Sequence, residues 1–363
     1  MAISHFRAFR INYTVSIMHK LPAEWAPQWA VQLTFPHANS DWADLLEEVL
    51  PCFVEIATTI ARFQKVIIVC QNAQSVAALF DQTSLANIIL QEIPSNDTWA
   101  RDHGGITVED ENGQPTILDF MFNGWGLKFP SDKDNLITKK LVDNGVFGPQ
   151  TQHQYTGMIL EGGGIESDGE GTLLTTAECL LSLNRNPQWS KTEIEQKLKD
   201  LLGVQQILWL NHGYLAGDDT DSHIDTLARL CTPDTIAYVQ CPDTSDEHYD
   251  ALKKMEEELQ QLKQLNGKPY HLVPLPWPDA CYSADGDRLP ATYANFLIIN
   301  GAVLVPTYGV PQDYAALEAL RPVFPDREII GINCRMLIEQ HGSLHCVTMQ
   351  YPISVASQNA QNQ

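Results

Sequence analysis

The sequence lacks the features of several common protein classes, and the first of these is an excess of basic residues. Its 363 residues include 23 Lys and Arg against 45 Asp and Glu, which gives a formal net charge of −22. Because binding to nucleic acid requires a basic surface that contacts phosphates, this balance argues against a nucleic-acid partner. An acidic surface is compatible with the attraction of a cationic substrate, but charge alone favours the simpler explanation, solubility.

The chain also has no long apolar run. No segment approaches the roughly 18 consecutive apolar residues of a membrane span, and the N-terminal region around Arg7 and Arg10 has no apolar core of signal-peptide length. These absences predict a cytoplasmic protein without membrane association. Residues 1–17 are expected to be a disordered extension or the product of a start codon assigned too early, and the polar residues 355–363 are expected to form a disordered tail.

The cysteines form no C-x-x-C pair, which argues against a zinc or thiol–disulfide motif. Most lie in apolar runs such as "KVIIVCQ" and "TTAECLLSL", so reduced and buried side chains are expected. The eight cysteines are Cys52, Cys70, Cys179, Cys231, Cys241, Cys281, Cys334 and Cys346. A single cysteine in an apolar run is usually a core residue, so Cys346 needs support from other motifs before it is interpreted as a nucleophile.

Local patterns predict alternating strands and helices. Residues 190–202 form the best-marked helix, because Ser190 and Glu193 make a capping box and Gly203 suits the helix end. A second helix is expected at about 246–264, ended by Asn266-Gly267. The segment "NFLIINGAVLVPTY" predicts a β-hairpin, since Asn-Gly between two β-rich runs is a strong hairpin signal.

In chain order these elements repeat as two strands, a helix and a strand. The repeats are about 157–176, 190–202 and 204–210; about 223–240, 246–264 and "YHLVPL"; and about 293–307, 311–321 and "REIIGI". The segments "AVQLTF", 40–63 and "KVIIVC" fit the same scheme less clearly. About five such units of ~60–70 residues could close into a ring, whereas a generic open α/β sheet is the simpler alternative.

Four Gly-containing segments place charged or reactive residues beside strands. They are "NDTWARDHGG" (96–105), "LEGGG" (160–164), "GDDTDSHIDT" (217–226) and "GSLHC" (342–346). They recur at intervals of about 60 residues, with the last interval about twice as long, so each lies near the same point of its unit. In a closed ring such points would meet at the axis. The residues that this predicts at one site are Asp102, Glu161, His223, Asp225 and Cys346.

The residue types favour chemistry on a cation. In a strand, His223 and Asp225 would face the same way, while His345 would point away from Cys346, so His223 is the expected base. Three acids at one site repel each other unless a cation lies among them. A guanidinium pairs bidentately with carboxylates, and its carbon is open to attack by a thiolate. Proton donation from His⁺ would then expel ammonia, and water would hydrolyse the covalent amidino-thioether to a ureido group.

Each motif also has an ordinary structural interpretation. The segment "GDDTDSHID" could be a solvated acidic loop, and it lacks the glycine and closing glutamate of a calcium-binding EF-hand. A metal site built from Asp, His and Cys is possible but has no standard spacing here. "LEGGG" could be a turn, and Trp99 with the following Arg-Asp could be a packed pair. Only the combination indicates a catalytic site.

At these residues the chain resembles the agmatine deiminase family, which is grouped with bacterial-type peptidyl-arginine deiminases. The resemblance runs from about Met18 and includes "PAEWAPQWAVQLTFP", "NDTWARDHGG", "FNGWGLKF", "LEGGGIESDGEGTLLTTAECLLSLNRNP", "GDDTDSHIDTLARL", "RLPATYANFLIINGAVLVP" and "GSLHCVTMQ". It implies an α/β pentein fold, five ββαβ units around a pseudo-fivefold axis, with residues 18–354 as one catalytic domain. It also implies hydrolysis of agmatine to N-carbamoylputrescine and ammonia in putrescine and polyamine biosynthesis, without metal or cofactor.

By motif match, Cys346 would be the nucleophile, His223 the general acid and base, and Glu161 a neighbour of His223 and the substrate. Asp102 and Asp225 would hold the guanidinium. In the substrate tail pocket, Trp99 would pack on the aliphatic chain, and Asp219 would lie where relatives bind the distal amine.

Two departures from the family pattern concern the substrate tail. Many relatives carry Gly-Gly-Gly-Asn-Ile before His-Cys, where this chain has "HGSLHC", and Asp219 replaces a Glu. The alternatives are therefore a deiminase of free or peptidyl arginine and an inactive member that binds a partner; a homo-oligomer is possible. The three acids predict that the free enzyme holds Cys346 mostly as a thiol, which a thiol pKa below about 6 would refute.

Overall fold

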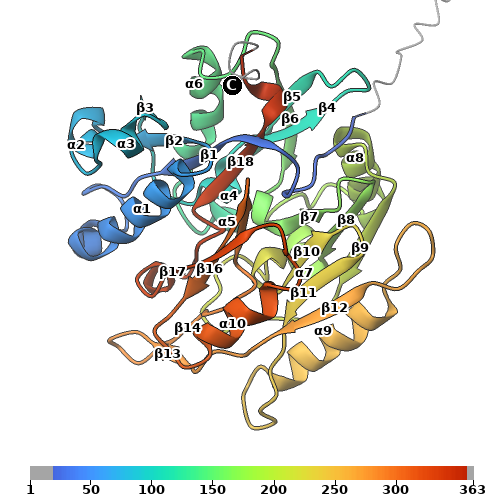
Figure 1. Ribbon diagram of the computed structural model, residues 1–363. Helices are drawn as coiled ribbons and strands as arrows, with labels where there is room; N and C mark the ends of the chain where they lie inside the picture. The colour runs from blue at the N-terminus through green and yellow to red at the C-terminus, as the bar shows by residue number, and fades with distance from the viewer. Residues whose placement is uncertain (1–18, 358–363) are drawn as a thin grey trace, which may run out of the picture.

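Five small sheets with one shared strand arrangement form the framework of the protein, whose computed structural model describes residues 19–357 (Figure 1). In each sheet one inner strand pairs antiparallel with one neighbour and parallel with the other, and one of the sheets has a fourth strand in parallel pairing. A helical connection joins the two parallel strands, because parallel neighbours need a crossover. The repeated two-strand, helix, strand unit predicted from the sequence is therefore present five times.

Four of the sheets are built from consecutive segments. They consist of β4 (Ile106–Glu109), β5 (Pro115–Met121) and β6 (Gln152–Ile159); β7 (Ile165–Ser167), β8 (Thr172–Thr176) and β9 (Gln206–Leu210); β10 (Ala228–Thr232), β11 (Thr235–Val239) and β12 (His271–Leu275); and β15 (Leu297–Ile299), β16 (Ala302–Thr307) and β17 (Glu328–Asn333). A small extra hairpin joins β13 (Cys281–Tyr282) to β14 (Arg288–Leu289).

The remaining sheet joins the two ends of the described chain. Its order is β18 (Thr348–Pro352), β1 (Gln28–Thr34), β2 (Lys65–Cys70) and β3 (Ile88–Glu92). The first strand of this unit comes from the C-terminal region, and Leu33 of β1 lies opposite Thr348 of β18. This explains why the N-terminal unit fitted the repeat poorly in the sequence. Figure 1 shows the red β18 returning to lie beside the blue β1.

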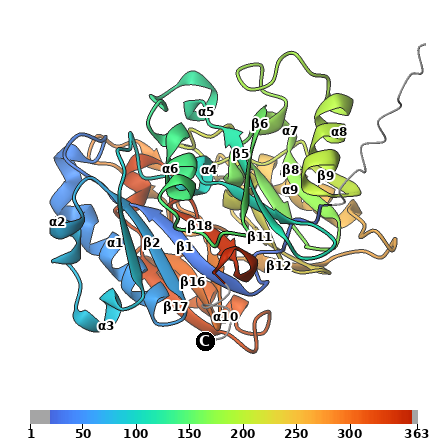
Figure 2. The same cartoon turned by 90° about the horizontal axis from the view of Figure 1, so that it is seen from above.

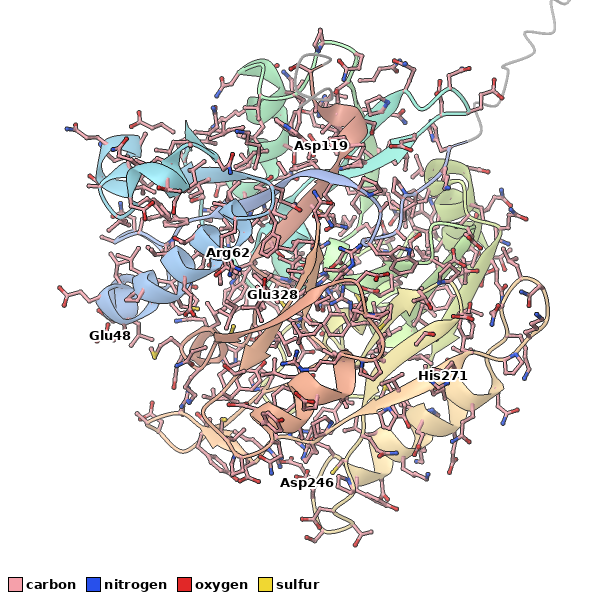
Figure 3. All side chains as sticks on the ribbon, viewed as in Figure 1. Glu48, Arg62, Asp119, Asp246, His271 and Glu328 are labelled. Atoms are coloured by element: carbon pink, nitrogen blue, oxygen red, sulfur yellow. The ribbon has the colours of Figure 1, made fainter. Side chains whose placement is uncertain are left out.

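The longer connecting helices cover the outside of these sheets. They are α1 (Leu46–Ala61), α6 (Ile137–Asp143), α8 (Lys191–Leu202), α9 (Tyr249–Gln261) and α10 (Asp313–Leu320). Figure 2 shows α1 and α8 on opposite sides of the molecule. Figure 3 shows Arg62, which follows α1, beside Glu328 of β17, and the side chains form an ion pair of 3.1 Å at the surface. None of the helices in residues 19–357 is long and apolar enough to cross a membrane.

Several predictions of local structure are confirmed. Ser190 and Glu193 form the capping box of α8, and Gly203 ends this helix with a φ of 70°. Asn300-Gly301 joins β15 to β16 as the predicted hairpin turn. The helix expected at 246–264 is shorter, because α9 begins at Tyr249 and ends at Gln261, before Asn266-Gly267.

Two strand predictions are wrong in their boundaries. Residues 157–159 belong to the last strand of one unit, β6, which ends before Leu160, and the pair β7–β8 begins only at Ile165. Likewise 223–226 forms the 3-10 turn η4 (Ile224–Thr226), and the strand pair begins at Ala228. In both places the polar Gly-containing segment is the crossing between units, whose backbone bends too sharply for a strand. The expected disorder of residues 1–17 lies outside the described residues, as does that of the tail from residue 358. Within the expected tail, Val355 ends the 3-10 turn η6 (Ile353–Val355), and both Val355 and Ala356 are buried.

Candidate active site

The predicted polar segments converge on one point of the molecule. Each lies just before the first strand of its unit: Asp102 in α4 (Ala100–His103), Glu161 before η3 (Gly162–Gly164), His223 and Asp225 at η4, and Cys346 before β18. Gly163 marks their meeting point. A Cβ atom on Gly163 would lie 2.6 Å from His223 Nδ1, 2.8 Å from Asp102 Oδ1 and 3.2 Å from Asp225 Oδ2. Only glycine leaves these side chains room to approach each other.

His223 is fully buried between two carboxylates. Its Nδ1 lies 3.6 Å from Asp102 Oδ1, and its Nε2 lies 3.8 Å from Glu161 Oε2. Burial alone would lower the pKa of His223, but the charge of Asp102 and the contact with Glu161 outweigh it and raise that pKa well above its usual value. The two carboxylates therefore favour the protonated imidazole.

Asp102 is anchored at both oxygens. The backbone N–H of Gly163 donates to Oδ1 at 3.1 Å, and Trp125 Nε1 donates to Oδ2 at 2.9 Å. Burial raises the pKa of the Asp102 carboxyl to about 6, against the opposing charge of His223. Trp125 was not predicted as a site residue, although it lies in the "FNGWGLKF" segment.

Glu161 is held by a buried arginine that the sequence analysis did not select. Arg185 Nε donates to Glu161 Oε2 at 2.7 Å, and Arg185 Nη1 donates to Asp221 Oδ2 at 2.6 Å. Burial alone would raise the pKa of Glu161, but the contact with His223 and the charge of Arg185 lower it. Glu161 therefore stays ionised beside His223, and Cys179 Sγ lies 3.9 Å away.

Asp225 connects the thiol to a second histidine. Its Oδ2 lies 2.7 Å from His345 Nδ1 and 3.8 Å from Cys346 Sγ, and His345 Nε2 lies 2.7 Å from Glu24 Oε2. Burial would raise the pKa of Asp225, but the hydrogen bond and charge of His345 lower it. The strand alternation expected for His345 and Cys346 is wrong, since both lie in a turn before β18. Each nitrogen of His345 nonetheless faces a carboxylate, and neither contacts Cys346 in the described residues.

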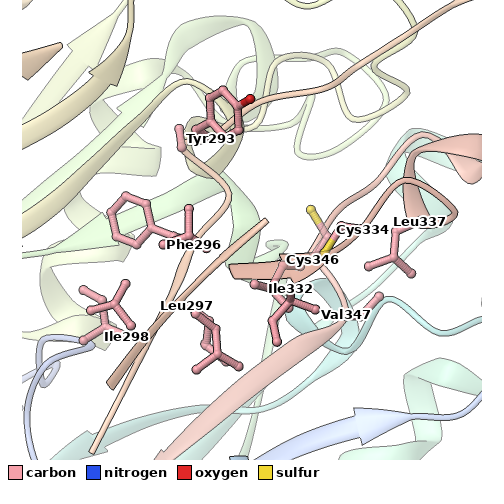
Figure 4. Packing of buried hydrophobic residues seen from close by; sticks show 14 of the residues in the cluster. Tyr293, Phe296, Leu297, Ile298, Ile332, Cys334, Leu337, Cys346 and Val347 are labelled. Atoms are coloured by element: carbon pink, nitrogen blue, oxygen red, sulfur yellow. The ribbon is translucent and has the colours of Figure 1, made fainter. Parts of the chain in front are cut away.

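Cys346 lies at the edge of the apolar core and is 4% exposed. Figure 4 shows it among buried apolar side chains that include Cys334 and Val347. Burial raises the pKa of the Cys346 thiol well above its usual value, and the charges of Asp225 and Asp102 raise it further. This is the direction that the three acids predicted.

Asn295 supplies the fifth unit's contribution to the site and was missed in the sequence. Its Oδ1 accepts hydrogen bonds from the backbone N–H groups of His345 at 2.8 Å and Cys346 at 3.3 Å, and lies 3.4 Å from Cys346 Sγ. Its Nδ2 donates to the carbonyl oxygen of Asp225 at 3.2 Å. The doubled interval between His223 and Cys346 was the signal that could have found it.

A pocket of about 430 Å³ leads from the surface to Cys346 and is lined by Asp102, Trp99 and Asp219. Trp99 is 6% exposed, and Gly342 packs flat against its indole: a Cβ on Gly342 would lie 2.1 Å from Trp99 Cζ3. The glycine of "HGSLHC" thus shapes the wall of the pocket. Asp219 lies nearer the surface, and its Oδ2 is 3.8 Å from His341 Nε2.

Two further acids, Asp41 and Asp97, also line the pocket. Neither was predicted as a site residue from the sequence. Burial raises the pKa of Asp97 to about 6. Among the described residues that line the pocket, none is Lys or Arg. Lys128 lies close by but donates to the Asp219 carbonyl at 2.6 Å and to Asp221 Oδ1 at 2.7 Å. The pocket therefore favours a cationic molecule.

Several buried polar atoms near Asp102 and Cys346, the catalytic candidates that line this pocket, have no hydrogen-bond partner among residues 19–357. They are both ring nitrogens of His223, Oε1 of Glu161 and Oδ1 of Asp225. Buried polar atoms are normally paired, so an unpaired group at one point indicates a place for a ligand. The two carboxylate oxygens require N–H donors, and a planar guanidinium offers five of them.

Two groups of side chains come close enough to hold a metal ion: Glu161 with Cys179 and His223, and Glu24 with Glu166 and His345. In each group an arginine already donates to the carboxylates: Arg185 to Glu161, and Arg229 to Glu24 and Glu166. The arginine guanidinium that contacts these carboxylates compensates the negative charge that a metal ion would otherwise compensate. Neither group is therefore well suited to a metal ion.

Comparison with known proteins relates this chain to a family of deiminases. The family model described as Porphyromonas-type peptidyl-arginine deiminase matches residues 20–352. The agmatine deiminase of Stutzerimonas stutzeri is 34% identical over 354 residues, which cover 92% of this chain and 95% of that protein.

Solved structures share the mixed α/β fold. A Porphyromonas gingivalis protein named provisionally as an arginine deiminase is 55% identical with a TM-score of 0.88, covering 92% of this chain and 98% of that one. The agmatine deiminase of C. jejuni with substrate bound is 40% identical with a TM-score of 0.87, covering 93% and 98%. Most of this chain therefore has the fold of those deiminases.

Proposed function

We propose that this chain, which belongs to the Porphyromonas-type peptidyl-arginine deiminase family, hydrolyses agmatine to N-carbamoylputrescine and ammonia. The observation that carries the proposal is the group of unpaired buried atoms beside the thiol. Within residues 19–357, Oδ1 of Asp225 and Oε1 of Glu161 accept no hydrogen bond, and Asp225 Oδ2 lies 3.8 Å from Cys346 Sγ. A guanidinium bound there would satisfy the carboxylates and present its carbon to the sulfur.

The reaction begins with the thiol. In the free enzyme the pKa of the Cys346 thiol is raised. The positive charge of the bound guanidinium lowers that pKa, and the thiol proton then leaves to solvent. The thiolate attacks the guanidinium carbon and forms a C–S bond. His223, held protonated by Asp102 and Glu161, gives its proton to one terminal nitrogen, and that C–N bond breaks to release ammonia.

Water completes the reaction. Neutral His223 takes a proton from water, whose oxygen attacks the carbon of the amidino-thioether. Collapse of that intermediate forms the ureido carbonyl as the hydroxyl proton leaves to solvent, breaks the C–S bond and returns the thiolate, which regains a proton from solvent after product release. Asp102 and Asp225 hold the guanidino nitrogens through both steps. Glu161 keeps His223 oriented and is itself held by Arg185.

The pocket walls favour agmatine over arginine. Asp41, Asp97 and Asp219 are acids that suit the distal ammonium of agmatine, whereas the α-carboxylate of arginine needs a cationic partner. Trp99 offers its indole face to the alkyl chain. Deimination of free or peptidyl arginine is the second candidate, favoured by the names of the matching family and of the P. gingivalis relative.

The same proposal includes the arrangement of the whole chain. The five repeated units are inferred to surround a pseudo-fivefold axis, as in a pentein, with the site at that axis; the five sheets are separate in residues 19–357, and no hydrogen-bonded sheet closes on itself. Residues 18–354 are proposed to be one catalytic domain. A cytoplasmic location, a role in putrescine formation and a homo-oligomer are proposed from the resemblance alone.

Substrate choice is tested by measuring ammonia release from agmatine, free arginine and an arginine peptide, each with the unmodified enzyme and with Asp219→Asn. We expect agmatine to have the highest kcat/KM, and we expect Asp219→Asn to raise KM for agmatine while kcat changes little. A higher kcat/KM for arginine or the peptide would favour the second candidate. No release from any of the three would contradict both.

A further inference from the structure

A second cavity lies behind the catalytic residues. It opens to solvent, has an empty volume of about 670 Å³ that includes this open part, and is bounded by residues 21–26, β4, β7 and β18. Arg101 and Gly162 line it, while their chain neighbours Asp102 and Glu161 belong to the catalytic group on the other side. The two cavities therefore lie back to back, separated by the turns that carry the catalytic side chains.

Arg101 is the unusual residue of this cavity. It is 4% exposed, yet its Nη2 has no hydrogen-bond partner among residues 19–357, and the nearest carboxylate oxygen, Glu24 Oε2, is 4.0 Å away. Its other contacts are long: Nε to the His345 carbonyl at 3.5 Å and Nη1 to Met349 Sδ at 3.7 Å. A guanidinium has five N–H donors, so most of the hydrogen-bonding capacity of Arg101 is unused.

Arg229, a neighbouring buried arginine, has its positive charge compensated by two carboxylates. Arg229 Nη2 donates to Glu24 at 2.8 Å, and its Nε donates to Glu166. These acids raise the pKa of Arg229, whereas burial lowers the pKa of Arg101 despite the charge of Glu24. Arg101 is thus the buried cation whose charge is poorly balanced.

The two acids that line the cavity, Glu24 and Glu166, already accept a hydrogen bond at each carboxylate oxygen. Glu24 Oε1 accepts from the Ile298 N–H at 2.7 Å, and Glu166 Oε2 accepts from the Leu230 N–H at 3.0 Å, while Arg229 takes the remaining oxygen of each. By contrast, Thr107 and Gln350 are lining residues whose buried Oγ1 and Oε1 atoms have no hydrogen-bond partner among the described residues. The amide of Gln350 can turn to present its NH₂ instead.

Apolar side chains complete the walls. Ile106, Ile165 and Met349 line the cavity beside these polar atoms. The cavity thus combines an under-compensated guanidinium, a free hydroxyl and an amide with an apolar surface. This is the usual composition of a small-molecule site, in which a few polar groups fix orientation and apolar groups supply area.

We propose that this rear cavity binds a small carboxylate that carries a short apolar chain. The carboxylate accepts from Arg101 Nη2 and from the Thr107 hydroxyl, and the chain packs on Ile106, Ile165 and Met349. A charged hydrogen bond from a buried guanidinium is the strong kind, so the interaction suits a carboxylate better than a neutral alcohol.

Calorimetric titration of the full chain with butyrate tests the proposal, with butylammonium and n-butanol as probes of opposite and zero charge. A Cys346→Ser chain saturated with agmatine serves as the host, so that the catalytic pocket is filled and turnover is prevented. We expect one saturable butyrate site, and binding by butanol weaker by about tenfold or more. Butylammonium is expected not to bind this host.

Variants locate the site. Thr107→Val is expected to weaken butyrate binding by about five- to tenfold. Its matched control is Thr172→Val, which removes another buried threonine hydroxyl, outside the cavity. Arg101→Met is expected to abolish binding; because it could disturb folding, the Thr107 pair carries the test. No saturable butyrate binding, equal effects of the two threonine variants, or displacement of butyrate by agmatine would overturn the proposal.

Discussion

Asn295 Oδ1 lies 3.4 Å from Cys346 Sγ and also accepts the backbone N–H of Cys346 at 3.3 Å. One amide oxygen from the turn before β15 therefore fixes both the backbone and the side chain of the proposed nucleophile. Because the same oxygen accepts from the His345 N–H, Asn295 shapes the whole turn that carries the thiol.

The first prediction concerns this amide. Asn295→Ala is expected to lower kcat by about 10- to 100-fold, since it removes the side-chain acceptor of the Cys346 N–H and frees the thiol to move, while the His345 N–H keeps only the Asn295 backbone carbonyl. The measurement is steady-state ammonia release, together with the rate of Cys346 alkylation by iodoacetamide. The matched control is Asn300→Ala in the adjacent hairpin, where the side chain contacts Gln28 and not the thiol. Equal losses of kcat in the two variants would contradict a positioning role.

A second prediction concerns the pH dependence of substrate binding. The pKa of Asp102 is raised to about 6, so the carboxylate loses its charge as the pH falls through that value and no longer attracts a guanidinium. In a Cys346→Ser chain, the Kd for agmatine is expected to be constant above about pH 7 and to rise by up to tenfold per pH unit below about 6. Calorimetry over pH 5–8 measures this. Adding Asp102→Asn is expected to weaken binding and flatten its pH dependence; an unchanged slope would exclude Asp102 as the titrating group.

The buried pair of Glu161 and Arg185 gives a third prediction. Arg185→Met is expected to lower the free energy of unfolding by about 3–5 kcal/mol, because it leaves the Glu161 charge buried without its partner. Combining it with Glu161→Gln is expected to restore much of that stability but not activity. Urea unfolding and ammonia release measure the two effects separately. If the double variant were no more stable than Arg185→Met, the loss would not come from the uncompensated carboxylate.

The contact between Gly342 and Trp99 gives a fourth prediction. Gly342→Ala is expected to raise KM for agmatine by about tenfold, since its methyl group would force the indole of Trp99 into the pocket. Trp99→Phe in the same chain is expected to recover part of the loss, because the smaller ring leaves space for the methyl group. KM for agmatine, measured for the two single variants and the double variant, tests whether the two side chains interact. Independent, additive losses would show that the two residues do not interact.

The sequence predicted those features that local patterns determine. Ser190 and Glu193 form a local capping box, and Asn300-Gly301 is a local turn, so both could be read from neighbouring residues. The regular interval of the polar segments also placed Asp102, Glu161, His223 and Cys346 near one another.

The rest depends on contacts between distant segments. The pairing of β1 with β18 joins the two ends of the described chain, and no local pattern indicates it. Arg185 resembles any surface arginine until the fold buries it beside Glu161. The strand geometry assumed for His223 and Asp225 was wrong because their segment is a turn between units, and Asn295 lies in an apolar segment that was interpreted only as a hairpin.

The central claim is that Cys346 forms a covalent intermediate with agmatine. The most direct measurement is mass spectrometry of enzyme mixed with agmatine and quenched in acid within milliseconds, followed by peptide mapping. We predict a transient adduct on Cys346, with the mass of agmatine less ammonia, that decays as N-carbamoylputrescine forms and is absent in Cys346→Ala. Turnover without any adduct at Cys346, or an adduct on another residue such as Cys179, would contradict the account.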